Sequence, residues 1–132
     1  MIALAIDEKT TKPVRALSRE DPELVIWILS EVEISSALWR RRRSNEITDT
    51  VRAEAQRQMD LTISNAVVVT DVSTVLRRAR RLLATHTLRA ADAMQLAAAL
   101  VACEDDPARL PLVTSDDRLA QAALQEGFTV VP

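Results

Sequence analysis

The apolar residues of this chain form two kinds of pattern, which alternate along the sequence. Four short, continuously apolar runs are typical of β-strands buried on both faces: residues 24–29, 66–70, 110–114 and 128–131. Between these runs, apolar residues recur three and four positions apart, which is the spacing of an amphipathic helix. This periodicity predicts helices over residues 13–18, 31–43, 48–63, 73–84, 90–103 and 117–125.

Strands that alternate with helices predict an α/β fold with a parallel sheet covered by helices on both sides. Gly127 is the only glycine, and it follows the last predicted helix, where a left-handed C-terminal cap is favoured. The chain has 132 residues and no repeat, linker or low-complexity segment. We therefore expect a single domain over residues 1–132.

Composition excludes several kinds of site. One glycine cannot build a phosphate-binding loop or a dinucleotide fingerprint, since both need several glycines. The only histidine is His86 and the only cysteine is Cys103, so a catalytic triad, a zinc site and an internal disulfide are all unsupported. A bound metal would have oxygen ligands, as Mg²⁺ or Mn²⁺ does. No run is long enough to span a membrane and the start lacks a secretory signal, so we expect a cytoplasmic protein.

Carboxylate chemistry remains, and the first candidate is Glu33. It lies just beyond the predicted strand 24–29, on the first turn of the next helix. One interpretation is a capping box, in which Ser30 and Glu33 satisfy each other's backbone donors. The other is that Glu33 faces the ligand crevice at the carboxyl edge of the sheet. This stretch alone does not decide between them.

The second candidate is Asp92, the only acidic residue in a predicted helix made largely of alanine, leucine, methionine and valine. A helix that is apolar nearly all round is buried, and a buried aspartate is costly unless it is paired or binds a metal. An aspartate near a helix N-terminus is also favoured by the helix dipole. The apolar surroundings favour a functional role for Asp92.

The third candidate is Asp116, which follows the predicted strand 110–114 together with Asp117. One of the two aspartates is expected to cap the last helix, which leaves the other free to act. Asp71 also ends a predicted strand, but no second acidic residue lies near it in the sequence. Capping is a sufficient explanation for Asp71.

These stretches, taken in order, resemble the PIN domain, and in particular the VapC-like toxins of bacterial toxin–antitoxin pairs. The matching segments are VEISSAL with Glu33, LRAADAMQLAAAL with Asp92, and VTSDDRLAQAALQEGFTVV with Asp116. The resemblance extends from about Asp7 to Val131. It implies a three-layer α/β/α sandwich around a parallel sheet, in agreement with the apolar pattern.

The resemblance also implies a metal-dependent endoribonuclease toxin. Glu33, Asp92 and Asp116 would hold one or two Mg²⁺ or Mn²⁺ ions, which activate a water and neutralise charge on the scissile phosphate. The implied partners are an RNA substrate, a cognate antitoxin and a second copy of the chain. Thr114, Ser115 and Asp117 are candidates for a supporting role beside Asp116, and a run of four arginines could steer the RNA backbone to the metal: Arg40, Arg41, Arg42 and Arg43. The alternative interpretation of this run, which is the commoner one for such runs, is a solvated helix end that complements the helix dipole.

The N-terminus departs from the family. PIN toxins begin with a strand that carries an aspartate followed by a small hydroxyl residue, whereas Asp7 is followed by Glu8 and Lys9. The spacing from Asp7 to Glu33 is also shorter than in the family. We therefore expect the first strand to be missing, residues 1–6 to belong to a helix, and Asp7 to lie in a loop outside the site.

Two alternative functions follow from other observations. An incomplete acidic site is also compatible with a catalytically silent PIN-like module that binds a protein partner. The third hypothesis is a phosphorylatable receiver domain, which has a similar sheet but needs a lysine near its last strands. Both lysines, Lys9 and Lys12, are near the N-terminus, so the receiver hypothesis is weak.

Overall fold

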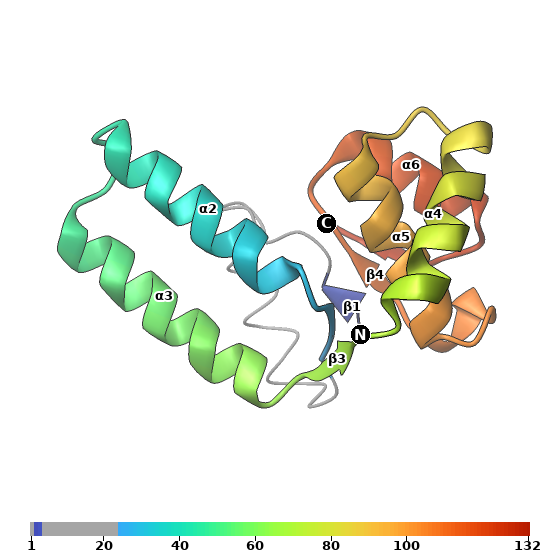
Figure 1. Cartoon of the computed structure of the whole chain (residues 1–132), viewed down its shortest axis with the longest axis horizontal. Coiled ribbons are helices and arrows are strands. Elements are labelled where there is room, and N and C mark those ends of the chain that lie inside the picture. The colour runs from blue at the N-terminus through green and yellow to red at the C-terminus, as the bar shows by residue number, and fades with distance from the viewer. Residues whose placement is uncertain (1, 4–23) are drawn as a thin grey trace.

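A parallel β-sheet forms the centre of the fold (Figure 1). The computed structural model describes residues 2–3 and 24–132. The strand order is β3-β2-β1-β4-β5, and every neighbouring pair is parallel. The described elements are β1 (Ile2–Ala3), β2 (Val25–Trp27), α2 (Ser30–Arg43), α3 (Asp49–Ser64), β3 (Val67–Val69), α4 (Val72–Thr85), α5 (Ala90–Ala102), a 3₁₀ turn η1 (Pro107–Arg109), β4 (Leu112–Val113), α6 (Asp117–Gln125) and β5 (Val130–Val131).

The apolar pattern predicted most of these elements. Each of the four predicted strands contains an observed strand, and each observed strand is shorter than its apolar run. The predicted helices from residue 31 onward agree with α2 to α6 to within one residue at each end. The predicted helix over residues 13–18 lies outside the described residues. The α/β fold with a parallel central sheet is confirmed.

The expectation about the N-terminus is wrong for Ile2 and Ala3. These residues form β1, a strand at the centre of the sheet: Ile2 is in register with Val25 of β2 and with Leu112 of β4. The prediction of a missing first strand had left the central position of the sheet empty. In the structure, residues 2–3 of this chain occupy that position. A short apolar run does not by itself distinguish a strand from a helical turn, and pairing with both neighbours decides it here. Asp7 lies outside the described residues.

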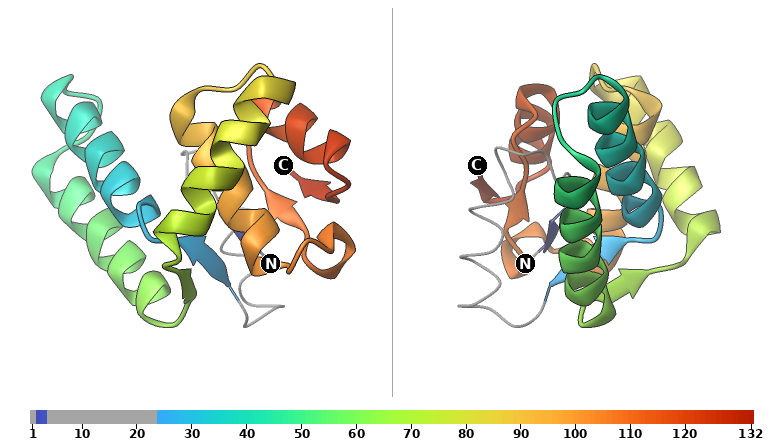
Figure 2. Two further views of the ribbon diagram at one scale, coloured as in Figure 1. Left: turned by 45° about the vertical axis from the view of Figure 1, so that its right-hand side comes forward. Right: turned by 90° about the vertical axis from the view of Figure 1, so that its left-hand side faces the viewer.

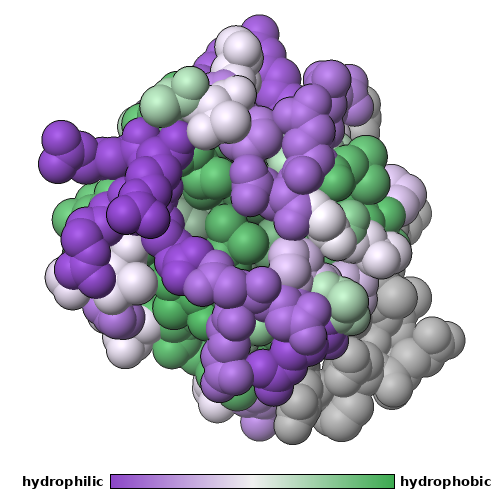
Figure 3. All heavy atoms as spheres, turned by 90° about the vertical axis from the view of Figure 1, so that its right-hand side faces the viewer, coloured by the Kyte–Doolittle hydropathy of each residue, from purple (hydrophilic) through white to green (hydrophobic). Residues whose placement is uncertain are grey.

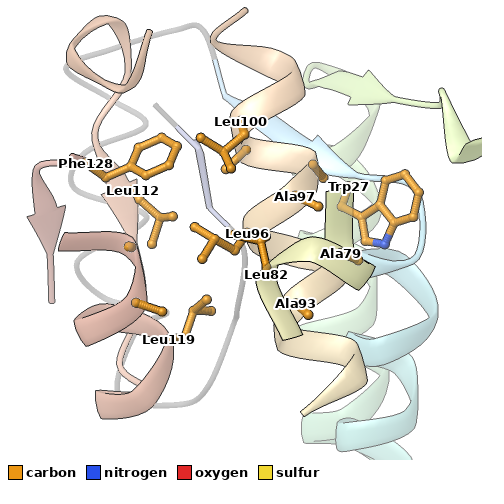
Figure 4. Close-up of a cluster of buried hydrophobic side chains, with 14 of the residues drawn as sticks. Trp27, Ala79, Leu82, Ala93, Leu96, Ala97, Leu100, Leu112, Leu119 and Phe128 are labelled. Atoms are coloured by element: carbon orange, nitrogen blue, oxygen red, sulfur yellow. The ribbon is translucent and has the colours of Figure 1, made fainter. Parts of the chain in front are cut away.

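The sheet packs on both faces, because successive residues of a strand point to opposite sides. On one face, Val25, Trp27 and Leu112 pack against α4, α5 and α6. On the other, Leu24, Ile26 and Val113 form a smaller cluster with Ile63 and other partly buried residues. Figure 4 shows the larger cluster, in which the side chains of α5 lie between those of β4 and α6 on one side and those of β2 and α4 on the other.

The prediction that each strand is buried on both faces is wrong for β3. Val67 is 59% exposed and Val68 is 37% exposed, whereas Val69 is half-buried. The reason is that β3 is the edge strand beside β2, so it has a neighbour on one side only. A run of valines predicts a strand, but it does not reveal whether that strand lies at the edge.

Helices α2 and α3 pack against each other and extend together from the sheet as an arm (Figures 1 and 2). The arm begins directly after β2 and returns directly into β3. This placement puts the first turn of α2, with Glu33, beside the sheet and puts the last turn at the far end. At the other end of the chain, Gly127 has a φ of 97°, which confirms the predicted left-handed residue after α6.

Candidate metal centre

The three candidate acids come from three helices that begin at the same edge of the fold. Glu33 lies on the first turn of α2, which follows β2, and Asp92 lies on the first turn of α5. Asp116 follows β4 and immediately precedes α6. The carboxyl ends of parallel strands form the usual ligand crevice of an open α/β sheet. Glu33 and Asp92 are half-buried, whereas Asp116 is exposed.

A side-chain hydrogen bond connects Glu33 to α5. Gln95 Nε2 donates to Glu33 Oε2 at 2.6 Å, and Gln95 itself is only 6% exposed. Burial raises the pKa of the Glu33 carboxyl above its ordinary value; the hydrogen bond from Gln95 lowers this pKa, and the negative charge of Asp92 raises it. Gln95 therefore fixes one carboxylate oxygen of Glu33 and leaves the other oxygen available.

Asp92 is the middle member of the group. Burial raises the pKa of its carboxyl, and the charge of Asp116 raises this pKa further. A hydrogen bond to the Arg89 backbone and the positive charges of Arg89 and Arg118 act in the opposite direction and lower it. Asp92 thus interacts electrostatically with Glu33 and also with Asp116. The three predicted acids are thus linked pairwise through Asp92, although within residues 2–3 and 24–132 they are not grouped closely enough to hold a metal ion as they stand.

Asp116 is the N-cap of α6. Its Oδ1 accepts a hydrogen bond from the Leu119 backbone N–H at 2.8 Å, and its own backbone N–H donates to Thr114 Oγ1 at 3.1 Å. The sequence predicted that Asp116 or Asp117 would cap this helix, and Asp116 does so. The cap uses one oxygen and fixes the rotamer, so the second oxygen points from a defined position.

The donor set suits a hard divalent cation. Carboxylates whose pKa values are raised by burial and by one another are the groups that such an ion stabilises in the charged form. Two polar atoms beside Glu33, Gln95 Oε1 and Ser30 Oγ, are buried without a hydrogen-bond partner. Among residues 2–3 and 24–132, however, no three side chains of histidine, cysteine, aspartate or glutamate are grouped closely enough to form a ready-made metal site. Asp92 is the acid that interacts electrostatically with both of the others.

The family model of the PIN domain matches residues 1–124, nearly the whole chain. The chain belongs to the PIN domain family. PIN domains are generally metal-dependent nucleases, which agrees with the carboxylate donor set. No curated protein matches the sequence.

Among solved structures, this PIN domain is similar to a chain of the structure described as FitAB bound to IR36 DNA fragment. The two chains share 14% sequence identity with a TM-score of 0.60, and the match covers 99% of this chain and 94% of the other. At this level of identity the similarity establishes the fold. None of the described helices of the PIN domain is long and apolar enough to cross a membrane.

The capping-box interpretation of Glu33 is wrong. The N-cap of α2 is Leu29, which makes no side-chain cap, and Ser30 lies inside the helix with its Oγ unpartnered. Glu33 instead accepts its hydrogen bond from Gln95 of another helix. This contact removes the structural alternative and keeps Glu33 in the acidic cluster.

The predicted supporting residues differ in their positions. Thr114 is 2% exposed, and its hydroxyl accepts from the Asp116 backbone, so it positions Asp116 from below the surface. Ser115 is half-buried beside it, and Asp117 is exposed in the first turn of α6. Thr114 has a direct structural link to the acidic cluster through its hydrogen bond with the Asp116 backbone.

The four predicted RNA-contacting arginines occupy the last turn of α2, at the far end of the arm. Arg41 pairs with Glu46 at 3.2 Å and Arg42 pairs with Asp49 at 2.7 Å, both across the turn into α3. Arg40 and Arg43 are exposed. Seven to ten residues separate these arginines from Glu33, which is about 10–15 Å along the helix axis.

Two residues of the cluster were missed from the sequence. Gln95 is the only uncharged polar side chain within α5, three positions after Asp92 and therefore on the same face of the helix. That pattern was a usable signal. Arg118 influences Asp92 from α6, and the sequence contains no signal for this proximity because 26 positions separate the two residues.

Proposed function

We propose that this PIN domain is a metal-dependent endoribonuclease toxin of a toxin–antitoxin pair that acts in the cytoplasm. The observation that supports this most is that Asp92 interacts electrostatically with both Glu33 and Asp116, although the three acids come from separate elements. Placing like charges together in a partly buried position raises their pKa values and is unfavourable for the fold alone. A bound cation would offset this cost.

Glu33, Asp92 and Asp116 would hold Mg²⁺ or Mn²⁺. The ion would supply an activated water and would neutralise charge on the scissile phosphate. Gln95 orients Glu33 through its hydrogen bond, and the cap of α6 orients Asp116. In each of these two contacts only one carboxylate oxygen is used, Oε2 of Glu33 and Oδ1 of Asp116.

We also propose that Arg40 and Arg43 contact the RNA backbone away from the site. Both side chains are exposed at the end of the arm, whereas Arg41 and Arg42 are already paired with acidic residues. A positive charge at this distance would hold a passing strand without reading its sequence. Only a strand long enough to reach from the crevice to the end of the arm would gain from it.

The proposed protein partners, a cognate antitoxin and a second copy of the chain, are supported by apolar side chains on the arm. Val32 is 65% exposed and Trp39 is 45% exposed on α2, and Val51 and Leu61 of α3 are more than half exposed. Exposed apolar groups of this size favour a protein contact. The solved neighbour FitAB was described bound to a DNA fragment, and the RNA substrate is our proposal for this chain.

The test is Mn²⁺-dependent cleavage of single-stranded RNA by the wild-type chain and by Asp92→Asn. We expect cleavage by the wild type and a loss of at least 100-fold in the variant, since removing a group that stabilises transition-state charge typically costs that much. Asp106→Asn is the matched control, because Asp106 is exposed in the loop before η1 and its side chain makes no hydrogen bond or ion pair within the described part of the chain.

The alternative is a catalytically silent PIN module that binds a protein partner. The observation in its favour is that the acids within residues 24–132 do not form a closed metal-binding group. Isothermal titration with Mn²⁺ separates the two functions. Absence of Mn²⁺ binding, together with equal RNA cleavage by the wild type and Asp92→Asn, would support the silent module and exclude the nuclease.

A further inference from the structure

A cavity of about 270 Å³ lies between the loop that follows α4 and one face of α6. Figure 3 views the molecule from the side of α4 and α6, where hydrophilic side chains form most of the surface around smaller apolar patches. Ala122 forms a buried apolar part of the wall, and the remainder of the lining is polar. The lining residues are Thr85, His86, Thr87, Arg118, Gln121, Ala122 and Gln125.

Both walls of the cavity continue into the acidic cluster. Thr87 lies five positions before Asp92, at the start of the segment that leads into α5. Arg118 lies two positions after Asp116, in the first turn of α6, and its positive charge acts on the Asp92 carboxyl. A molecule in the cavity would therefore lie next to the acids, with Arg118 between the two sites.

The lining offers hydrogen-bond donors that the fold does not use. Arg118, Gln121 and Thr87 have no side-chain hydrogen bond or ion pair with any described residue. Arg118 contributes a permanent positive charge and a planar set of N–H groups that match a phosphate. The Gln121 amide and the Thr87 hydroxyl add further donors within the same cavity.

The wall behind these donors is held rigidly. The His86 side chain is 6% exposed, and its ring lies between two residues at the end of α6. Nε2 is 2.5 Å from Glu126 Oε1, and Nδ1 is 2.9 Å from Gln125 Oε1. Glu126 is therefore paired with His86, and none of the described residues that line the cavity carries a carboxylate, which leaves the cation of Arg118 to face a ligand.

We propose that this cavity binds the nucleotide of the substrate strand that lies next to the scissile phosphate, with Arg118 holding that nucleotide's phosphate. The proposal rests on the proposed nuclease function and adds a substrate-binding site to it. Ligand pockets commonly measure roughly 300–1,000 Å³, so a cavity of about 270 Å³, just below that range, suits one nucleotide unit and not a duplex. Gln121 and Thr87 are placed to contact the same unit.

The test compares Arg118→Ala with Arg80→Ala as the matched control. Arg80 is also an exposed arginine on a helix, and its side chain makes no hydrogen bond or ion pair with any residue that the structure describes. The probe is a short, fluorescently labelled single-stranded RNA, measured by anisotropy in EDTA so that no cleavage occurs. We expect Arg118→Ala to weaken binding roughly tenfold, because a charge-assisted phosphate contact is lost, and Arg80→Ala to bind within about twofold of the wild type.

The salt dependence provides an independent readout. Loss of one phosphate contact to a single strand lowers the slope of log Kd against log salt by about 0.7, whereas a merely structural effect leaves the slope unchanged. Gln121→Ala is a second variant and is expected to weaken binding without changing the slope. Thermal melting of each variant checks the fold.

Failure of this proposal is distinguishable from failure of the nuclease function, because binding in EDTA does not require catalysis. If the wild type cleaves RNA but Arg118→Ala binds the probe as tightly as the wild type does, the cavity is not the nucleotide site. Undetectable binding by the wild type, or an equal loss in Arg118→Ala and Arg80→Ala, would also overturn the proposal.

Discussion

Asp92→Asn should separate metal binding from stability, because Asp92 interacts with both other acids. The substitution keeps the size of the side chain and an oxygen that can accept the hydrogen bond from the Arg89 backbone, but it removes the negative charge. Without metal, Glu33 and Asp116 each lose a like-charged neighbour. Both interactions are partly screened by solvent and are worth at most about 1 kcal/mol together. The attraction of Asp92 to Arg89 and Arg118 is lost too and opposes this gain. We therefore expect the free energy of unfolding of the metal-free variant to exceed that of the metal-free wild type by 0 to about 1 kcal/mol.

The pH dependence has a defined sign. Glu33 and Asp92 have pKa values raised above their ordinary values of 4.5 and 3.8. Between the unfolded and the folded pKa of each group, the folded state binds more protons, so the contribution of these groups to stability falls as the pH rises above about 4. Asp49, Asp71 and Asp105 have lowered pKa values and contribute in the opposite direction. The stability difference between Asp92→Asn and the wild type isolates the effect of the raised pKa of Asp92. This difference should grow as the pH rises.

Bound Mn²⁺ should make the wild type more stable than Asp92→Asn, which reverses the order expected without metal. A ligand at 100 times its Kd stabilises the folded state by about 2.7 kcal/mol. For a chain of this length, that corresponds to a rise in Tm of roughly 8–13 °C. We expect this rise for the wild type with excess Mn²⁺ and at most a small fraction of it for Asp92→Asn, measured by circular dichroism at pH 7.5 with Mn²⁺ or EDTA. Asp106→Asn is the control and should follow the wild type in both conditions.

Two results would refute the reasoning. An equal rise in Tm for Asp92→Asn and the wild type on addition of Mn²⁺ would place the metal elsewhere. A metal-free variant that is clearly less stable than the wild type at pH 7.5 would mean that Asp92 serves the fold through attraction to Arg89 and Arg118, and that repulsion within the cluster is negligible.

Three further substitutions test the remaining contacts. Asp116→Ala removes both the α6 cap and the carboxylate and should lower the free energy of unfolding in urea by about 1 kcal/mol. Asp116→Asn keeps the cap and should lose only the Mn²⁺ response. Equal stability of the two variants would contradict the capping role. Gln95→Leu removes the hydrogen bond to Glu33 and therefore raises the pKa of Glu33 further. It should weaken Mn²⁺ binding roughly tenfold in calorimetric titration, and the weakening should be greater at pH 5.5 than at pH 7.5. Unchanged affinity would mean that Glu33 is not a ligand. Asp7→Asn tests the prediction that Asp7 lies outside the site and should leave the rise in Tm with Mn²⁺ unchanged. A reduced rise would contradict that prediction.

The apolar pattern predicted the helices and strands from residue 24 onward because each of these segments carries its own signal. The strand at Ile2 does not, since a segment this short becomes a strand only through its two neighbours in the sheet. The exposure of Val67 and Val68 was likewise hidden, because a position at the edge of a sheet depends on strand order and not on local composition. Sequence reasoning therefore found the elements and missed properties set by tertiary arrangement.

The candidate site shows the same division. Asp92 could be identified because an acid inside an apolar helix is costly wherever that helix packs. Glu33 could not be separated from a capping residue, since the deciding partner, Gln95, is 62 positions away. The prediction that one aspartate after β4 would cap α6 was confirmed. The further expectation, that the aspartate not used for capping is the one free to act, stays a prediction, because the cap uses only one of the two carboxylate oxygens of Asp116.

The energetics of the cluster argue for a ligand more strongly than the position of any single acid does. Three carboxylates delivered by α2, α5 and the segment before α6 require the tertiary fold to bring like charges together, and no local structure benefits from this. The fold supplies one hydrogen bond to Glu33, one cap at Asp116 and the nearby charge of Arg118, and the pKa values of Glu33 and Asp92 are still raised. A divalent cation would relieve the remaining electrostatic cost. Arg118 would then be free to hold a phosphate of the substrate beside that cation.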